Sequence, residues 1–158
     1  HFSEFWQLAK KHDLIRGAYH FYRADEDPVL QANNFLANVK LESGDLPPVL
    51  DIEKIPKRKT NKKLIEDLKI WCNIVEKTYG TRPIIYTYYH YYKDFLSDDF
   101  SDYPLWLANY NDVPEPSPVD DWKFWQFTEN GIVYGINSKV DLNVFDGNLW
   151  SLKRMTLD

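Results

Sequence analysis

The sequence is poor in several features that would each indicate a class of protein. Its single cysteine, Cys72, excludes an internal disulfide and a zinc site built from cysteines. Cys72 follows Trp71 in a helical pattern and is interpreted as a small buried hydrophobic residue. No stretch approaches the ~18 consecutive apolar residues of a membrane-spanning helix. No signal peptide, internal repeat or low-complexity segment is visible.

Basic residues are also fewer than acidic ones. The chain has 19 Lys and Arg against 24 Asp and Glu, a formal net charge of −5. A nucleic-acid-binding surface needs an excess of basic side chains, so we expect no nucleic-acid partner. The basic run at residues 57–59, with Lys62 and Lys63, is interpreted as a solvated loop that leads into a helix.

Residues suited to metal or nucleophilic chemistry are scattered. The histidines lie on unrelated predicted elements without the spacing of metal ligands: His1, His12, His20 and His90. No Ser or Cys lies in a Gly-x-Ser-x-Gly context. We therefore expect no metal ion and no other cofactor.

Aromatic residues, in contrast, are abundant, with 11 Tyr, 9 Phe and 6 Trp in 158 residues. Such an excess builds a core, but it also suits stacking against the flat faces of sugar rings. The length predicts one domain over residues 1–158.

The segment Pro48-Val49-Leu50-Asp51-Ile52-Glu53 places two carboxylates at the end of an apolar run. Side chains alternate along a strand, so Asp51 and Glu53 should share one face and lie roughly 6.5–7 Å apart at Cα, with Ile52 on the other face. Repulsion between the two helps to keep one protonated near neutral pH. Paired carboxylates of this kind serve glycoside hydrolysis. The alternative is two solvated charges on an edge strand.

Helical and extended patterns alternate along the chain. Asp27 before Pro28 predicts a helix start, Thr60 caps a second long helix, and Gly80 ends it. We predict helices at 2–12, 28–41, 61–79 and 89–96, and strands at 15–23, 49–53, 82–88, 105–110, 122–128 and 140–145.

This order predicts an α/β fold with parallel strand pairs. Several candidate polar residues fall toward the C-terminal ends of their strands, where a (β/α) barrel carries its active site. A complete barrel has eight strands and about 250 residues, whereas we count about six strands here.

The sequence resembles glycoside hydrolase family 25, the lysozymes of the Chalaropsis type. The resemblance rests on motifs in the family's order that span nearly the whole chain: Gly17-Ala18-Tyr19-His20-Phe21, Pro48 to Glu53, Pro83-Ile84-Ile85-Tyr86-Thr87, Leu105 to Tyr110, Trp125-Gln126-Phe127-Thr128 and Val140-Asp141-Leu142-Asn143.

The resemblance implies a modified TIM-like barrel whose last strands are joined without regular helices. It also implies cleavage of the β-1,4 bond between N-acetylmuramic acid and N-acetylglucosamine in peptidoglycan, outside the cytoplasmic membrane. By position, Glu53 would be the general acid. Asp51 would stabilise positive charge on the sugar or steer its acetamido group, and Asp141 matches a further acidic residue of the site. Family 25 is usually discussed as retaining.

The sugar groove is expected to involve further residues, namely His20, Tyr86, Trp106, Tyr110 and Gln126. Trp106 and Tyr110 share strand parity with Ala108, a small residue that would leave room for a sugar. For His20 the alternative is an interior position, and its neighbour Tyr19 is expected in the core.

Family members begin with two further strand–helix units, and the first carries another active-site aspartate. We expect about 45 residues of this kind to be absent from the chain. A barrel opened in this way exposes strand edges, which favours self-association.

Two other functions remain open. One is a non-catalytic glycan-binding module on a truncated barrel. The other is a chitinase-like hydrolase, which would need a longer series of acidic residues than the segment before Asp51 supplies.

Overall fold

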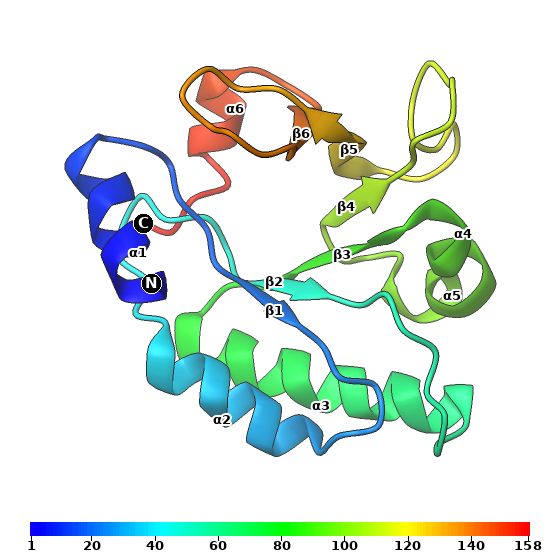
Figure 1. Cartoon of the computed structure of the whole chain (residues 1–158). Coiled ribbons are helices and arrows are strands. Elements are labelled where there is room, and N and C mark those ends of the chain that lie inside the picture. Colours follow the sequence, from blue (N-terminus) through cyan, green and yellow to red (C-terminus); the bar gives the residue numbers. More distant parts are fainter.

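Strands and helices alternate through the first two thirds of the chain and give a curled sheet with helices on its outer side (Figure 1). The computed structural model describes all of residues 1–158. The elements are α1 (Phe2–Lys11), β1 (Tyr19–Phe21), α2 (Pro28–Asn38), β2 (Val49–Asp51), α3 (Asn61–Tyr79), β3 (Ile84–Tyr88), α4 (Tyr89–Tyr91), the π-helical turn η1 (Tyr92–Leu96), α5 (Ser97–Phe100), β4 (Leu105–Ala108), β5 (Trp122–Gly131), β6 (Val140–Phe145) and α6 (Leu149–Lys153).

The sheet has six strands in the order of the sequence, β1 to β6. Neighbouring strands from β1 to β5 pair in parallel, and β6 returns antiparallel to β5. Strands β1 and β6 are the two edges, so the sheet forms part of a barrel and does not close. The predicted six-stranded, barrel-like α/β fold is confirmed.

Local signals fix the start of α2 and both ends of α3 as predicted, whereas α2 ends at Asn38, before the expected residue 41. The Asp27 side chain accepts hydrogen bonds from the backbone N–H groups of Val29 and Leu30 at the start of α2. Thr60 caps α3 through Lys63 N–H, and Gly80 ends that helix in the left-handed region at φ 71°. These caps satisfy backbone groups that the helix itself leaves unpaired.

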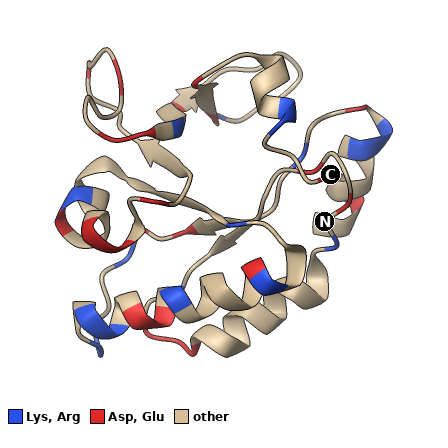
Figure 2. Cartoon of the chain, turned by 180° about the vertical axis from the view of Figure 1, so that it is seen from behind, with Lys and Arg blue, Asp and Glu red and all other residues tan.

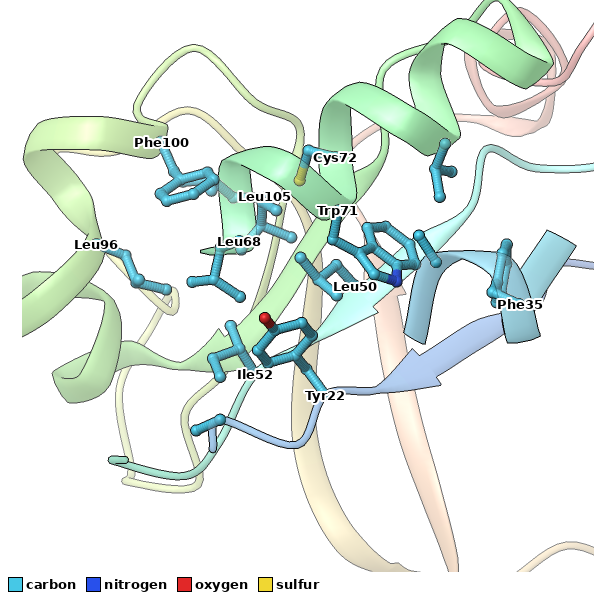
Figure 3. Close-up of a cluster of buried hydrophobic side chains, with 14 of the residues drawn as sticks. Tyr22, Phe35, Leu50, Ile52, Leu68, Trp71, Cys72, Leu96, Phe100 and Leu105 are labelled. Atoms are coloured by element: carbon cyan, nitrogen blue, oxygen red, sulfur yellow. The ribbon is translucent and has the colours of Figure 1, made fainter. Parts of the chain in front are cut away.

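The main core lies between the sheet and the helices α2 and α3, below the sheet in Figure 1. Figure 3 shows Leu50 of β2 and Ile52, the residue after β2, directed toward α3, where they pack with Leu68 and Trp71. Leu50, Ile52 and Trp71 have no exposed surface. Because side chains alternate along a strand, this packing turns Asp51 to the opposite, concave side of the sheet.

Charged residues of both signs are mixed along the helices, and no element is uniformly basic (Figure 2). In the basic run, Lys59 and Lys63 lie 2.7 and 2.9 Å from carboxylate oxygens of the buried Asp67. No helix combines the length and the apolar composition that crossing a bilayer requires.

Two contacts join segments distant in sequence. Buried Arg16 binds buried Asp45 through two hydrogen bonds of 2.7 and 3.1 Å, donates to the Trp6 carbonyl and lies over the Trp6 ring at 4.0 Å. Near the other end of the chain, Leu157 exchanges backbone hydrogen bonds with Gly44 and Asp45. The loop after α2 therefore receives both α1 and the segment after α6.

Candidate active site

A cavity of about 330 Å³ opens on the concave side of the sheet, near the C-terminal ends of its parallel strands. All six strands contribute to its wall. Nine residues line it: Tyr19, Val49, Asp51, Glu53, Tyr86, Trp106, Gln126, Asp141 and Asn143. The sequence analysis names six of them as site residues, and the fold brings these six together.

Asp51 and Glu53 both line this cavity, as their strand parity predicts. Asp51 is buried, at 7% exposure, and its Oδ1 has no hydrogen-bond partner. Glu53 lies two residues after Asp51, the last residue of β2, and is more accessible than Asp51. Ile52 between them has no exposed surface and lies in the core.

Both carboxyls hold protons more strongly than free side chains do. Burial raises the pKa of Asp51 to about 7, and the neighbouring Glu53 adds to the rise. Burial also raises the pKa of Glu53; Lys54 opposes this rise and Asp141 adds to it. The site therefore retains a proton near neutral pH, which acid catalysis requires.

Asp141 and Asn143 reach the cavity from β6. Because β6 runs antiparallel to β5, they lie near the start or middle of their strand, not at its C-terminal end as expected. The reversed direction places them at the same end of the sheet as the other site residues. The Trp106 indole Nε1 donates a hydrogen bond of 2.8 Å to Asn143 Oδ1.

A group of tyrosines borders the cavity. Tyr86 packs edge-on against Trp106, with ring centroids 5.6 Å apart. Tyr110 does not line the cavity; it lies beside it, where its hydroxyl accepts a 2.9 Å hydrogen bond from buried Gln126. Burial raises the pKa of Tyr86 and that of Tyr110, the latter to about 12, so both hydroxyls are neutral.

The prediction that His20 lines this site is wrong. His20 pairs in register with Leu50, so it shares the face that packs on the helices. It stacks on Trp71 at 5.6 Å and lies 3.1 Å from Gln31 Oε1. Burial lowers the pKa of its imidazole.

The prediction for Tyr19 is wrong in the opposite way. We expected it in the core, whereas it lines the cavity and is 70% exposed. It pairs in register with Val49, which also faces the cavity. Counting parity outward from Asp51 through the paired strands would have identified it. Asn143, one of the polar residues that we expected near a strand end but to which we gave no role, also lines the cavity.

No group of three or more His, Cys, Asp and Glu side chains is arranged to hold a metal ion. The polar atoms of the cavity are carboxyl, amide, indole and phenol groups. They equip it for proton transfer and hydrogen bonding to a polar, ring-shaped ligand.

Comparison with solved structures finds this fold elsewhere. A family 25 glycosyl hydrolase from Bacillus anthracis superimposes with a TM-score of 0.87 and 31% sequence identity, over 98% of this chain and 75% of that one. A bacterial lysozyme from Streptomyces coelicolor gives a TM-score of 0.87 at 26% identity, over 98% and 78% of the two chains.

Sequence relatives agree. The uncharacterized protein YegX of Escherichia coli (strain K12) is 39% identical over 153 residues, which cover 97% of this chain and 56% of YegX. Lysozyme M1 of Streptomyces globisporus is 32% identical over 161 residues, covering 93% of this chain and 55% of that protein. This chain thus spans about half the length of these relatives.

The family model for glycosyl hydrolases family 25 matches residues 1–136. This match covers most of the chain and agrees with the fold comparison and with the sequence relatives. The chain belongs to glycosyl hydrolase family 25.

Proposed function

We propose that this chain hydrolyses the β-1,4 bond between N-acetylmuramic acid and N-acetylglucosamine in peptidoglycan. The observation that carries the proposal is one cavity that holds Asp51 and Glu53 together with Asp141. Relatives named as lysozymes, from Streptomyces globisporus and Clostridium acetobutylicum, support the choice of substrate.

In the proposed reaction, Glu53 donates its proton to the glycosidic oxygen as the bond to the anomeric carbon breaks. The raised pKa of Glu53 favours this role, because burial keeps the acid form populated. Positive charge then develops on the sugar, next to the carboxyls of Asp51 and Asp141. A water molecule completes hydrolysis by adding its oxygen to the anomeric carbon and giving a proton to the Glu53 carboxylate, which restores the acid.

Asp51 has two alternative proposed roles. As a carboxylate it stabilises the positive charge directly. As the hydrogen-bond partner of the substrate's acetamido group, it steers that group toward the anomeric carbon. Its burial and its unpaired Oδ1 support either role, because that oxygen has no partner within the protein and can accept from the substrate.

The walls of the cavity suit a glycan strand. Tyr19, Tyr86 and Trp106 present aromatic surface on which sugar rings stack. At the border of the cavity, the Gln126 amide donates a hydrogen bond to the Tyr110 hydroxyl. Because peptidoglycan lies outside the cytoplasmic membrane, we place the activity in the cell envelope or outside the cell.

The test is release of reducing ends from purified peptidoglycan by this chain and by Glu53→Gln. Loss of a general acid should lower the rate about 10²- to 10⁴-fold. The control is Glu129→Gln, which removes the same charge from β5 outside the cavity. Full activity of Glu53→Gln would refute the assignment. Wild-type binding to peptidoglycan without any release would favour the non-catalytic glycan-binding module.

A further inference from the structure

We propose that Asn143 binds the substrate through its side-chain N–H group, which donates a hydrogen bond to the acyl oxygen of an N-acetyl group in the cavity. This inference rests on the proposed function and deepens it. It makes Asn143 the residue that distinguishes N-acetylated glycans from de-N-acetylated ones.

The first step is the orientation of the amide. An indole N–H only donates hydrogen bonds, so the atom of Asn143 that faces Trp106 Nε1 at 2.8 Å must be the amide oxygen. A flipped amide would direct two donors at each other. The Asn143 Nδ2 group is therefore turned away from the indole.

The second step is the position of Trp106 itself. Its ring packs edge-on against Tyr86 at 5.6 Å and lies 5.2 Å from the ring of Phe124, which is buried. With the indole held on two sides, the amide that accepts from it is held as well. Asn143 is thereby oriented before a ligand arrives, which lowers the entropy cost of binding.

The third step compares the nitrogen donors of the cavity. The side chains with N–H groups are Trp106, Gln126 and Asn143. Trp106 uses its single N–H on Asn143, and buried Gln126 directs one of its two amide hydrogens to Tyr110. Asn143 Nδ2 has no partner within the protein, so both of its hydrogens remain for a ligand.

The fourth step asks which ligand atom needs such a donor. The other strongly polar groups of the cavity are the carboxyls of Asp51, Glu53 and Asp141. In the proposed reaction the Glu53 proton goes to the glycosidic oxygen, and ionised carboxylates only accept, so the carboxyls suit that oxygen and the hydroxyl and N–H groups of a sugar. An acyl oxygen has no hydrogen to donate. The acyl oxygen therefore needs a hydrogen-bond donor that an ionised carboxylate does not provide and that the Asn143 amide does.

The experiment compares fully N-acetylated with de-N-acetylated peptidoglycan glycan as substrates. Asn143→Asp keeps an oxygen toward Trp106 and replaces the donor, while Asn143→Ala removes both. We expect each variant to raise KM for the N-acetylated glycan about 3- to 10-fold, the worth of one hydrogen bond, and to lose the preference for it. Asn130→Asp, on β5 outside the cavity, is the control for added charge and should behave as wild type.

A preference for the N-acetylated glycan that survives in both Asn143 variants would overturn the inference and leave the proposed function intact. If the wild type releases no reducing ends, the proposed hydrolysis fails, and binding of the two glycans followed by NMR titration decides about Asn143. Selective binding that is lost in Asn143→Ala supports the inference; equal binding, or none, overturns it.

Discussion

Asp51 is buried with one carboxyl oxygen unpaired, and this position is costly for an ionised group. Its pKa rises to about 7, whereas in the unfolded chain the same carboxyl ionises near its ordinary value of 3.8. The folded state therefore binds a proton that the unfolded state has lost between these two pH values. It follows that Asp51 makes the protein less stable as the pH rises from about 4 to about 7.

Replacing Asp51 by Asn should therefore stabilise the protein, with little effect at pH 4 and the full effect at pH 8. We expect about 2 kcal/mol at pH 8. This is roughly half of what a shift of three pKa units would give, because the cavity stays open to water. Urea unfolding of the two proteins at both pH values measures it. An equal or smaller gain at pH 8 than at pH 4 would contradict this explanation.

Single residues were predictable where their neighbours in sequence fix the strand parity. The apolar run before Asp51 shows that Leu50 and Ile52 face the core, so the two carboxyls had to share the other face. Tyr19 and His20 offer no such contrast, since both are amphipathic and either one can pack in a core. Only the pairing of Tyr19 with Val49 and of His20 with Leu50 decides between them.

Helix α1 depends on one buried ion pair for its place on the fold. Arg16 follows the helix, receives the Trp6 ring on its guanidinium and binds Asp45 in the loop after α2. Arg16 and Asp45 are 7% and 5% exposed, so removing Asp45 leaves the buried Arg16 guanidinium with only the half-exposed Glu42 carboxylate, 3.7 Å away, as its ionic partner.

We expect Asp45→Ala to lower the free energy of unfolding by about 3–5 kcal/mol. The double variant Arg16→Met with Asp45→Leu should lose much less, because neither charge is then left buried. A double-mutant cycle of Arg16→Met, Asp45→Leu and the double variant, followed by urea unfolding, measures the coupling between the two side chains. Additive effects of the single changes would show that the pair does not act as a unit.

Elements with strong local signals were predictable, and short ones were not. The caps of α2 and α3 are visible in the sequence because Asp27, Thr60 and Gly80 act on backbone groups close to them. Helix α6 has five residues, too few to show a helical period, and we did not predict it. The direction of β6 depends on its pairing with β5, which a strand pattern alone does not reveal.

At the scale of the whole molecule, the dominant feature is the free edge of β1. Ala18 and Tyr22 bond to β2 through their backbone groups, so the backbone groups of Tyr19 and Phe21 point away from the sheet. A hollow of about 580 Å³, lined mainly by apolar residues that include Phe2, Phe5 and Phe21, runs beside this edge. An unpaired edge with apolar surface favours pairing with another chain.

We predict that the isolated chain self-associates, with β1 of one copy pairing with β1 of a second. Static light scattering should show a mass that rises with protein concentration. Phe21→Lys places a charge at the edge and should restore the monomer. Val119→Lys, at a loop position that is 75% exposed, is the control and should associate like wild type. A monomer at all concentrations for the unmodified chain would contradict the prediction.

The backbone bonds of Leu157 to Gly44 and Asp45 have a consequence for the cavity. They join the segment after β6 and α6 to the loop that leads into β2, while Leu152 and Met155 pack against the smaller core cluster of Val49, Ile84 and Phe124. The curvature of the open sheet is therefore held from the end opposite to the carboxyls. We therefore expect that detaching residues 149–158 lets the sheet flatten and moves Asp141 away from Glu53, which would couple the width of the cavity to a segment that does not line it.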